Sequence, residues 1–323
     1  EGDENVWRVA IVGEDATCIS VRFSEFGLEK GAYLYIWSPI THQFIGRFDH
    51  RNVKDWGGLA TGVVSGSEVI VELHQPISRG TTAPIAIDQA VYGYRSLLNY
   101  SEEIAAQFRG PFGNSGACNI NVNCPEGAPW QTESRSVVII VQGGWGQCTG
   151  AMINNTSNDG TPYFLTANHC LGNPGAWLFY FNHESPGCTG NTGPTNQSVS
   201  GASTLVSNSA SDYALLELSE TPPASFNVQY AGFDASGSTP ESAVGIHHPG
   251  GDIKKICFEE DSPFQTNAGG AAVWYINQWE DGVTEPGSSG SPLFDHNHRI
   301  IGQLYGGSAA CAGRGCRASR RRP

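Results

Sequence analysis

Short apolar segments bounded by turn residues recur along the whole chain, and this pattern constrains the fold more than any other feature. Examples are VWRVAIVG, CISVRFSEF, SVVIIVQG, DYALLEL and RIIGQLYGG. Segments of this length that are rich in β-branched and aromatic residues are typical of strands. The 41 glycines of the chain suit the connections between strands. The sequence therefore predicts an all-β protein.

The chain is long enough for two domains. Its 323 residues exceed the usual size of one domain, which is about 100 to 200 residues. A segment rich in glycine and proline, RGPFGNSGA, separates two regions of strand-like pattern. We predict a small β-rich domain over residues 1–98, a linker with a processing site over 99–115, and a second β domain over 116–311.

Residues 312–323 differ from the rest of the chain in charge. The formal net charge is -13, yet this segment holds a run of arginines: Arg314, Arg317, Arg320, Arg321 and Arg322. We interpret it as an aberrant tail that resembles out-of-frame translation, with an Arg-rich exosite as the alternative. The acidity of the remainder argues against a nucleic-acid partner, which requires a basic face. No apolar run approaches the roughly 18 residues of a membrane span, so no membrane partner is expected.

The nine cysteines favour disulfides over a metal site. They form no CxxC pair and no Cys/His cluster at zinc spacing, and this pattern is typical of an oxidising compartment. We therefore expect a secreted, extracellular protein with no cofactor and no metal. The chain begins at Glu1 and its one methionine is Met152, so we expect a processed or partial chain from which any secretory signal has been removed.

Three strings in the second half of the chain carry the residues of a nucleophilic site. They are LTANHC with His169, SDYALLEL with Asp212, and EPGSSGSP with Ser289. A serine hydroxyl is a poor nucleophile until a neutral imidazole accepts its proton, and the imidazole needs a carboxylate that fixes its tautomer. We therefore predict Ser289, His169 and Asp212 as a catalytic triad.

Glycines surround the predicted nucleophile. Gly287 and Gly290 allow the backbone to turn sharply and to direct amide groups at a carbonyl oxygen. We predict that the backbone N–H groups of Gly287 and Ser289 form an oxyanion hole.

These strings resemble those of the trypsin-like serine peptidases, and a narrower resemblance extends from about Gly113 to Cys311. GACNINVNCPEG, GIHHPGG and GVTEPGSSGSPLFD are similar to segments of the lysyl endopeptidases exported by bacteria. The resemblance implies a double β-barrel peptidase domain preceded by a prodomain, a zymogen, and cleavage of protein or peptide substrates after lysine. It also implies three disulfides. The implied pairs are Cys118 with Cys311, Cys124 with Cys188, and Cys148 with Cys170.

The sequence departs from the pattern of these families around the specificity pocket. Trypsin has an Asp six positions before the catalytic serine, where this chain has Val283. The lysyl endopeptidases are expected to place a pocket carboxylate about nine residues after the last structural cysteine, and that position holds Arg320. Ser288 stands where trypsin-like zymogens use an Asp to capture a new N-terminus. We therefore expect activation by removal of the prodomain and weak cleavage after lysine.

Two alternatives stay open. The chain could be an inactive or truncated member of the family that acts as a binding module, or residues 1–98 could be a carbohydrate-binding domain with Trp37 and Trp56 as its aromatic residues. The paired His247 and His248 are interpreted as structural residues rather than metal ligands.

Overall fold

The computed structural model describes residues 4–77, 84–93, 115–142, 145–268 and 270–311. By its contacts the chain divides into two units. The first is residues 1–110 with 175–178, and the second is residues 111–174 with 179–323. All of the predicted linker except Ser115 lies outside the described residues, as do Arg320, Cys316 and the rest of the predicted tail.

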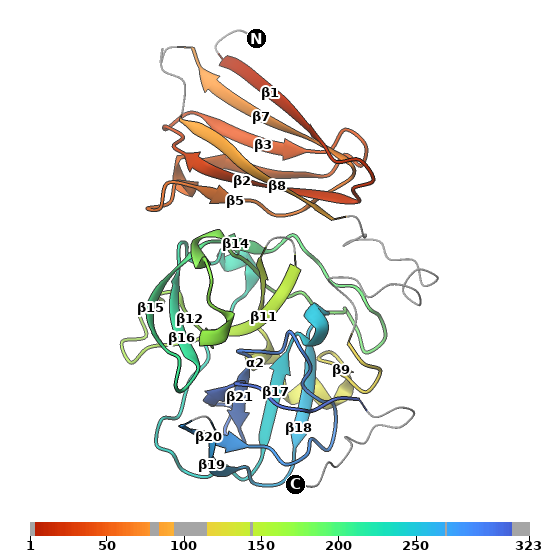
Figure 1. Cartoon of the computed structure of the whole chain (residues 1–323), viewed down its shortest axis with the longest axis vertical. Coiled ribbons are helices and arrows are strands. Elements are labelled where there is room, and N and C mark those ends of the chain that lie inside the picture. Colours follow the sequence, from red (N-terminus) through yellow and green to blue (C-terminus); the bar gives the residue numbers. More distant parts are fainter. Residues whose placement is uncertain (1–3, 78–83, 94–114, 143–144, 269, 312–323) are drawn as a thin grey trace. The chain divides into compact units, whose positions relative to one another are not determined.

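The first unit contains two antiparallel sheets, drawn in red to orange in Figure 1. One has the strand order β1-β7-β3-β4, and in the other β2 pairs with β5, β6 and β8. The strands of the first sheet are β1 (Glu4–Val12), β3 (Tyr33–Trp37), β4 (Phe44–Asp49) and β7 (Glu68–Pro76). Those of the second are β2 (Cys18–Phe26), β5 (Leu59–Ala60), β6 (Val64–Ser65) and β8 (Ile85–Gly93). A single 3₁₀ turn, η1 (His50–Asn52), follows β4.

Strand alternation builds the core of this unit. Along β7 every second residue is buried, and Val69 and Val71 pack in one cluster with Leu34 of β3 and with Ile19 and Phe23 of β2. Because successive side chains of a strand point to opposite faces, each sheet contributes one apolar face to this core.

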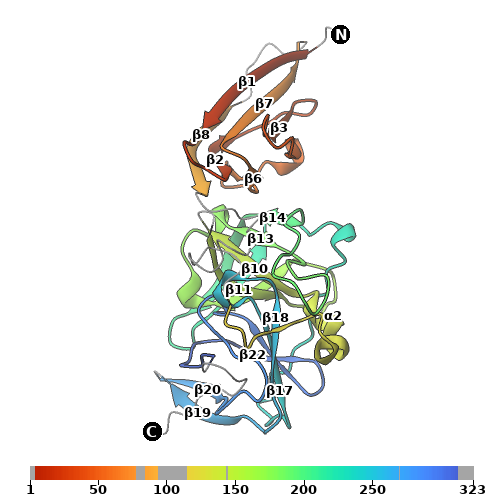
Figure 2. The same ribbon diagram turned by 90° about the vertical axis from the view of Figure 1, so that its right-hand side faces the viewer.

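The described residues between 115 and 311 form a seven-stranded sheet, a five-stranded sheet and a hairpin. The larger sheet has the order β14-β13-β10-β11-β12-β16-β15. Its strands are β10 (Val137–Gln142), β11 (Trp145–Met152), β12 (Tyr163–Ala167), β13 (Leu178–Tyr180), β14 (Ser198–Ser200), β15 (Ala202–Asn208) and β16 (Tyr213–Leu218). The five-stranded sheet has the order β22-β21-β17-β18-β9, and β17 and β18 lie side by side in both Figure 1 and Figure 2. Its strands are β9 (Ile120–Asn121), β17 (Ala243–His247), β18 (Lys255–Glu259), β21 (Pro292–Asp295) and β22 (Ile300–Gln303).

Helical structure in the described residues between 115 and 311 is confined to short segments. They are η2 (Pro125–Trp130), α2 (Gln131–Ser134), η3 (Asn168–Cys170), η4 (Pro174–Ala176), η5 (Ala224–Phe226) and η6 (Pro249–Gly251). The hairpin strands are β19 (Phe264–Ala268) and β20 (Ala271–Tyr275). The prediction of an all-β protein is confirmed. Among the described residues, no helix has the length and apolar character needed to cross a bilayer.

Three disulfides lie in the second unit. They join Cys118 to Cys311, Cys124 to Cys188, and Cys148 to Cys170, which are the pairs that the family resemblance implies. Cys257 carries a buried free thiol.

Candidate active site

His169 and Asp212 lie at the ends of two neighbouring strands. β12 ends at Ala167, the 3₁₀ turn η3 carries His169, and β16 begins directly after Asp212. The two strands are antiparallel with Ala167 opposite Tyr213, so the register itself brings the His and the Asp together. Segments 43 residues apart in the sequence thus meet at one point.

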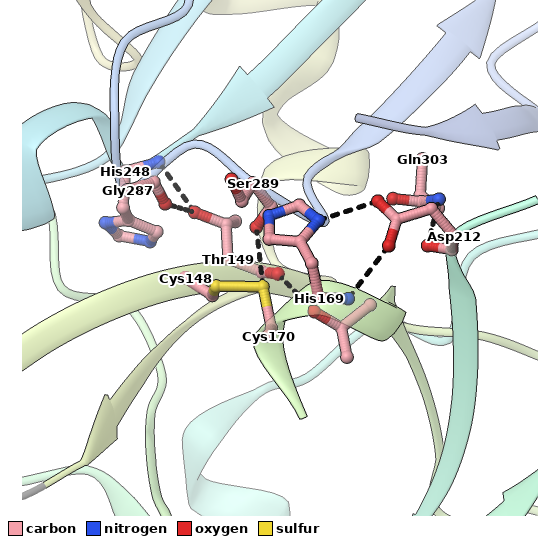
Figure 3. The surroundings of a disulfide bond; sticks show 10 residues. Cys148, Thr149, His169, Cys170, Asp212, His248, Gly287, Ser289 and Gln303 are labelled. Carbon is pink, nitrogen blue, oxygen red and sulfur yellow. Dashed lines mark hydrogen bonds and ion pairs between the residues drawn. A yellow bond between two sulfur atoms is a disulfide. The ribbon is translucent and has the colours of Figure 1, made fainter. Parts of the chain in front are cut away.

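The contact between the two side chains fixes the imidazole. The His169 ring Nδ1 lies 2.7 Å from Asp212 Oδ2, and the His169 backbone N–H donates to Asp212 Oδ1 over 2.8 Å. A carboxylate beside Nδ1 favours the tautomer with its proton on Nδ1, and this leaves Nε2 as an acceptor. Figure 3 shows the ring between the Asp212 carboxylate and Ser289.

Asp212 is itself held tightly. It is 3% exposed, and its backbone has φ 54°, in the left-handed region that Asp and Asn tolerate better than most residues. Its carbonyl oxygen accepts from the Asn168 N–H over 2.8 Å and from Gln303 Nε2 over 2.7 Å. The side-chain amide of Gln303, on β22, therefore connects Asp212 to the five-stranded sheet.

Ser289 lies on a turn that leads into β21, and two glycines give the turn its shape. Gly287 and Gly290 have φ values of 95° and 81°, which strongly favour glycine. The Ser289 carbonyl accepts from the Thr149 N–H over 2.8 Å, and the Gly290 N–H donates to Leu304 over 3.0 Å. These bonds attach the turn to β11 and to the segment after β22.

The backbone N–H groups of Gly287 and Ser289 donate no hydrogen bond to any described residue. The direction of each N–H group follows from the carbonyl of the preceding residue, because the carbonyl and N–H of a trans peptide point in opposite directions. The Pro286 carbonyl accepts from the Gly250 N–H over 2.6 Å, and the Ser288 carbonyl accepts from the Ser291 N–H over 3.0 Å. The N–H groups of Gly287 and Ser289 therefore point away from Gly250 and Ser291, and both are available to a ligand.

The end of β17 supports the same turn. The His248 N–H donates to Thr149 Oγ1 over 3.1 Å, and this hydroxyl in turn donates to the Gly287 carbonyl over 2.8 Å (Figure 3). His247 and His248 are completely buried. Burial lowers the pKa of His247 to about 3 and that of His248 well below its usual value. Both rings are therefore neutral near pH 7.

Val283, which has no carboxylate, stands at the sequence position that trypsin uses for specificity. Val283 is 1% exposed and packs with Cys257 and Trp279. The nearby Glu285 carboxylate already accepts from the Gly116 N–H over 2.9 Å and from Asn119 Nδ2 over 3.0 Å.

Two groups of side chains among the described residues have metal-ligand spacing. In the first, Cys148, His169 and Cys170, the two sulfurs form a disulfide and offer no thiolate. The second is Glu259, Asp261 and Glu280, whose carboxylate oxygens lie within 4.8 Å of one another. Burial, followed by the charge of Glu280, raises the pKa of Glu259 to about 7.

Several residues that shape the site were not predicted from the sequence. Gln303 and Thr149 lie in ordinary strand segments, and nothing local distinguishes them. His247 and Ser288 stand in the strings GIHHPGG and EPGSSGSP, but their contact joins positions 41 residues apart. The histidine pair in the first string is a visible signal, although the sequence alone indicates only a structural role for it.

Two comparisons of the sequence with known proteins lead to the same family. The family described as "Lysyl endopeptidase, C-terminal domain" matches residues 112–319. The chain is 29% identical over 273 residues to a protein named "Lysyl endopeptidase" from Pseudomonas aeruginosa, and the match covers 77% of this chain. The chain spans 57% of the length of that relative.

Similar solved structures are more distant. The Rv3671c protease from M. tuberculosis, in its active form, aligns with a TM-score of 0.35 and 18% identity over 54% of this chain and 71% of that one. Deg5 aligns with a TM-score of 0.36 and 14% identity over 54% of this chain and 80% of that one.

Proposed function

The chain belongs to the lysyl endopeptidase family, and on that premise we propose that it is a serine endopeptidase. Ser289 is the nucleophile, His169 is the general base and then the general acid, and Asp212 orients the imidazole and stabilises its charged form. The backbone N–H groups of Gly287 and Ser289 stabilise the oxyanion. Substrates are proteins or peptides, and the reaction needs no cofactor.

The contact of His169 with both oxygens of Asp212 is the observation that carries this proposal. It directs the acceptor nitrogen Nε2 away from the carboxylate, toward the side on which Figure 3 draws Ser289. The two available amide groups complete the arrangement, because they can stabilise the negative charge that develops on the substrate carbonyl oxygen during attack. His169 is 44% exposed at its side chain, so a substrate can reach it.

The reaction follows from these positions. The Ser289 oxygen attacks the substrate carbonyl carbon while His169 Nε2 takes its proton, and the tetrahedral intermediate places its oxygen between the two amide groups. His169 then returns the proton to the leaving amine, and an acyl-enzyme remains on Ser289. A water molecule, deprotonated by the same imidazole, releases the acid and restores the serine.

A fluorophosphonate probe tests the assignment of the nucleophile. The processed full-length protein should be labelled at Ser289, as located by peptide mass spectrometry, and should hydrolyse a protein substrate. Ser289→Ala should lose both properties, and Ser203→Ala, an exposed serine on β15, should keep both. A processed, folded chain that is neither labelled nor active would instead favour the alternative of a binding module.

The family name suggests cleavage after lysine, but we expect that preference to be weak in this chain. A buried ammonium needs a carboxylate partner, since an unpaired charge costs several kcal/mol and each 1.4 kcal/mol is about tenfold in rate. Val283 cannot supply that charge, and the sequence position at which the family is expected to carry its carboxylate holds Arg320. Amide substrates with Lys, Arg, Leu and Ala before the cleaved bond measure the preference. A strong preference for Lys would show that another carboxylate serves the pocket.

The first unit is proposed to act as a prodomain that assists folding or inhibits the peptidase. Expression of residues 113–323 alone should give less folded protein than the full chain, and the separate first unit should lower activity when added back. The chain is also proposed to be exported, and recovery of an active protein with its three disulfides from the culture medium checks this. Equal folding of the fragment without inhibition would exclude a prodomain.

A further inference from the structure

A buried histidine contacts the residue directly before the proposed nucleophile. His247 is the last residue of β17 and has no exposed surface. Its ring Nδ1 lies 2.7 Å from Oγ of Ser288, which is also completely buried. The bond joins the five-stranded sheet to the turn that carries Ser289.

The Ser288 hydroxyl also closes this turn from within. Its oxygen accepts from the Glu285 N–H over 3.1 Å, and the Ser288 N–H donates to the Glu285 carbonyl over 2.9 Å. Since the hydroxyl has one proton and its oxygen already accepts from Glu285, the proton is available to His247 Nδ1. A neutral imidazole, protonated on Nε2, completes the arrangement.

The turn needs an external support because its sequence does not make it rigid. Gly287 and Gly290 flank Ser288 and Ser289, and glycine loses more conformational freedom on ordering than any other residue. A rotation of either peptide plane would turn an amide group away from the substrate oxygen. The Ser288 side chain points into the protein between the two glycines, so a bond at this hydroxyl restrains both planes at once.

The remaining ring nitrogen supports a specific role for this histidine. His247 Nε2 is buried and has no hydrogen-bond partner among the described residues. Leaving a buried polar atom without a partner is unfavourable, and an apolar side chain at this position would avoid this. The contact of the other ring nitrogen with Ser288 is therefore the feature that favours a histidine here.

We propose that His247 is a positioning residue, which holds the proposed oxyanion hole in its working geometry through the hydroxyl of Ser288. This inference rests on the proposed function, because it gives His247 a part in the same reaction without contact to the substrate. It also explains how the turn can be ordered although Ser288 stands where a carboxylate would be needed to bind a new N-terminus.

Steady-state kinetics of two variants test the proposal. His247→Leu removes the acceptor, and Ser288→Ala removes the donor with almost no change in volume. Each should lower kcat by about 10- to 100-fold, less than the loss of an oxyanion donor itself, while KM changes by less than about twofold. Binding of a peptide aldehyde, which places an oxyanion in the hole, should weaken in proportion to kcat. The double variant should lose no more than the stronger single variant.

Two further variants separate positioning from general stability. His247→Asn can keep a polar atom near the Nδ1 position and should recover part of kcat. His183→Leu removes another buried ring, 4% exposed, whose Nδ1 lies 3.1 Å from the Pro194 carbonyl, and should lower the melting temperature without changing kcat. If His247→Leu does not fold, Ser288→Ala alone decides the result.

The outcomes distinguish this proposal from the function on which it rests. A labelled and active wild-type protein whose folded Ser288→Ala variant keeps full kcat and aldehyde affinity overturns the role of His247 only. A processed wild-type protein that is neither labelled nor active overturns the proposed function and the role of His247 with it.

Discussion

Each oxygen of the Asp212 carboxylate receives its own hydrogen bond from His169, one from the ring and one from the backbone. The ring bond sets the tautomer, and the backbone bond keeps η3 against the start of β16. The carboxylate therefore restrains both the orientation of the imidazole and the position of its Cα. A substitution that preserves the shape of Asp212 but not its charge separates these two effects.

Asp212→Asn should leave the fold intact and lower kcat by roughly 10³- to 10⁴-fold. Asparagine tolerates the left-handed φ of 54° at this position. Its amide has one acceptor oxygen, however, whereas His169 presents two donors, so the ring is expected to change its tautomer. Hydrolysis rates and the melting temperature measure the two effects. Full activity in this variant would exclude Asp212 from the proposed triad.

Gly290→Ala should reduce both stability and activity. A Cβ on Gly290 would lie 2.5 Å from the Thr149 carbonyl oxygen and 2.7 Å from the Ala167 nitrogen, and the residue has φ 81°. Backbone atoms cannot move aside cheaply, so the turn around Ser289 must shift. We expect a loss of about 2 kcal/mol or more in unfolding free energy. Gly187→Ala, where a Cβ has no atom within 4 Å, is the matched control and should be neutral in urea denaturation.

A prediction for stability concerns the buried ion pair between Lys254 and Glu184. Lys254 has no exposed side-chain surface, and its Nζ donates to Glu184 Oε2 over 3.0 Å and to the Ser134 carbonyl over 2.8 Å. Burial raises the pKa of Glu184, but Lys254 and the hydrogen bonds around the carboxylate outweigh this and lower its net pKa. Lys254→Met leaves that carboxylate without its cation and should cost about 3–5 kcal/mol.

Adding Glu184→Gln to Lys254→Met should restore part of the lost stability, because the unpaired charge is then removed. Lys30→Met changes an exposed lysine and is the matched control. The measurement is the free energy of unfolding in urea. A loss below 1 kcal/mol for Lys254→Met would contradict the importance of the pair.

The raised pKa of Glu259 predicts a pH-dependent effect on stability. Its folded value of about 7 lies above the usual 4.5, so its favourable contribution is complete below pH 4.5 and is lost as the pH rises through 7. Glu259→Gln should therefore gain stability relative to the wild type between pH 5 and pH 8, by at most about 3 kcal/mol. Glu126→Gln, at an exposed position, should show no such trend. Thermal unfolding at several pH values provides the comparison.

Much of the fold could be predicted because it depends on local patterns. Alternation in segments such as that of β7 and the continuous apolar run of β10 identify strands directly. The order of His169, Asp212 and Ser289 along the chain was equally visible, because each stands in a recognisable string.

The supports of the site could not be predicted in the same way. The Gln303 side chain holds the Asp212 carbonyl across 91 positions, and Thr149 reaches Gly287 across 138. Such contacts depend on sheet order and register, which no local pattern contains. The contact of His247 with Ser288 belongs to this class, and it became evident only once β17 was placed beside the turn.

The bond between Cys118 and Cys311 makes a covalent ring of the chain between these two positions, which are 193 residues apart in sequence. A single cut between them opens the ring into a line and releases no fragment from it. For the proposed peptidase, surrounded by other copies of itself, this has a practical consequence. A molecule nicked once in a surface loop between those cysteines keeps His169, Asp212 and Ser289 on one covalent assembly, and two cuts are needed before autolysis can carry one of them away.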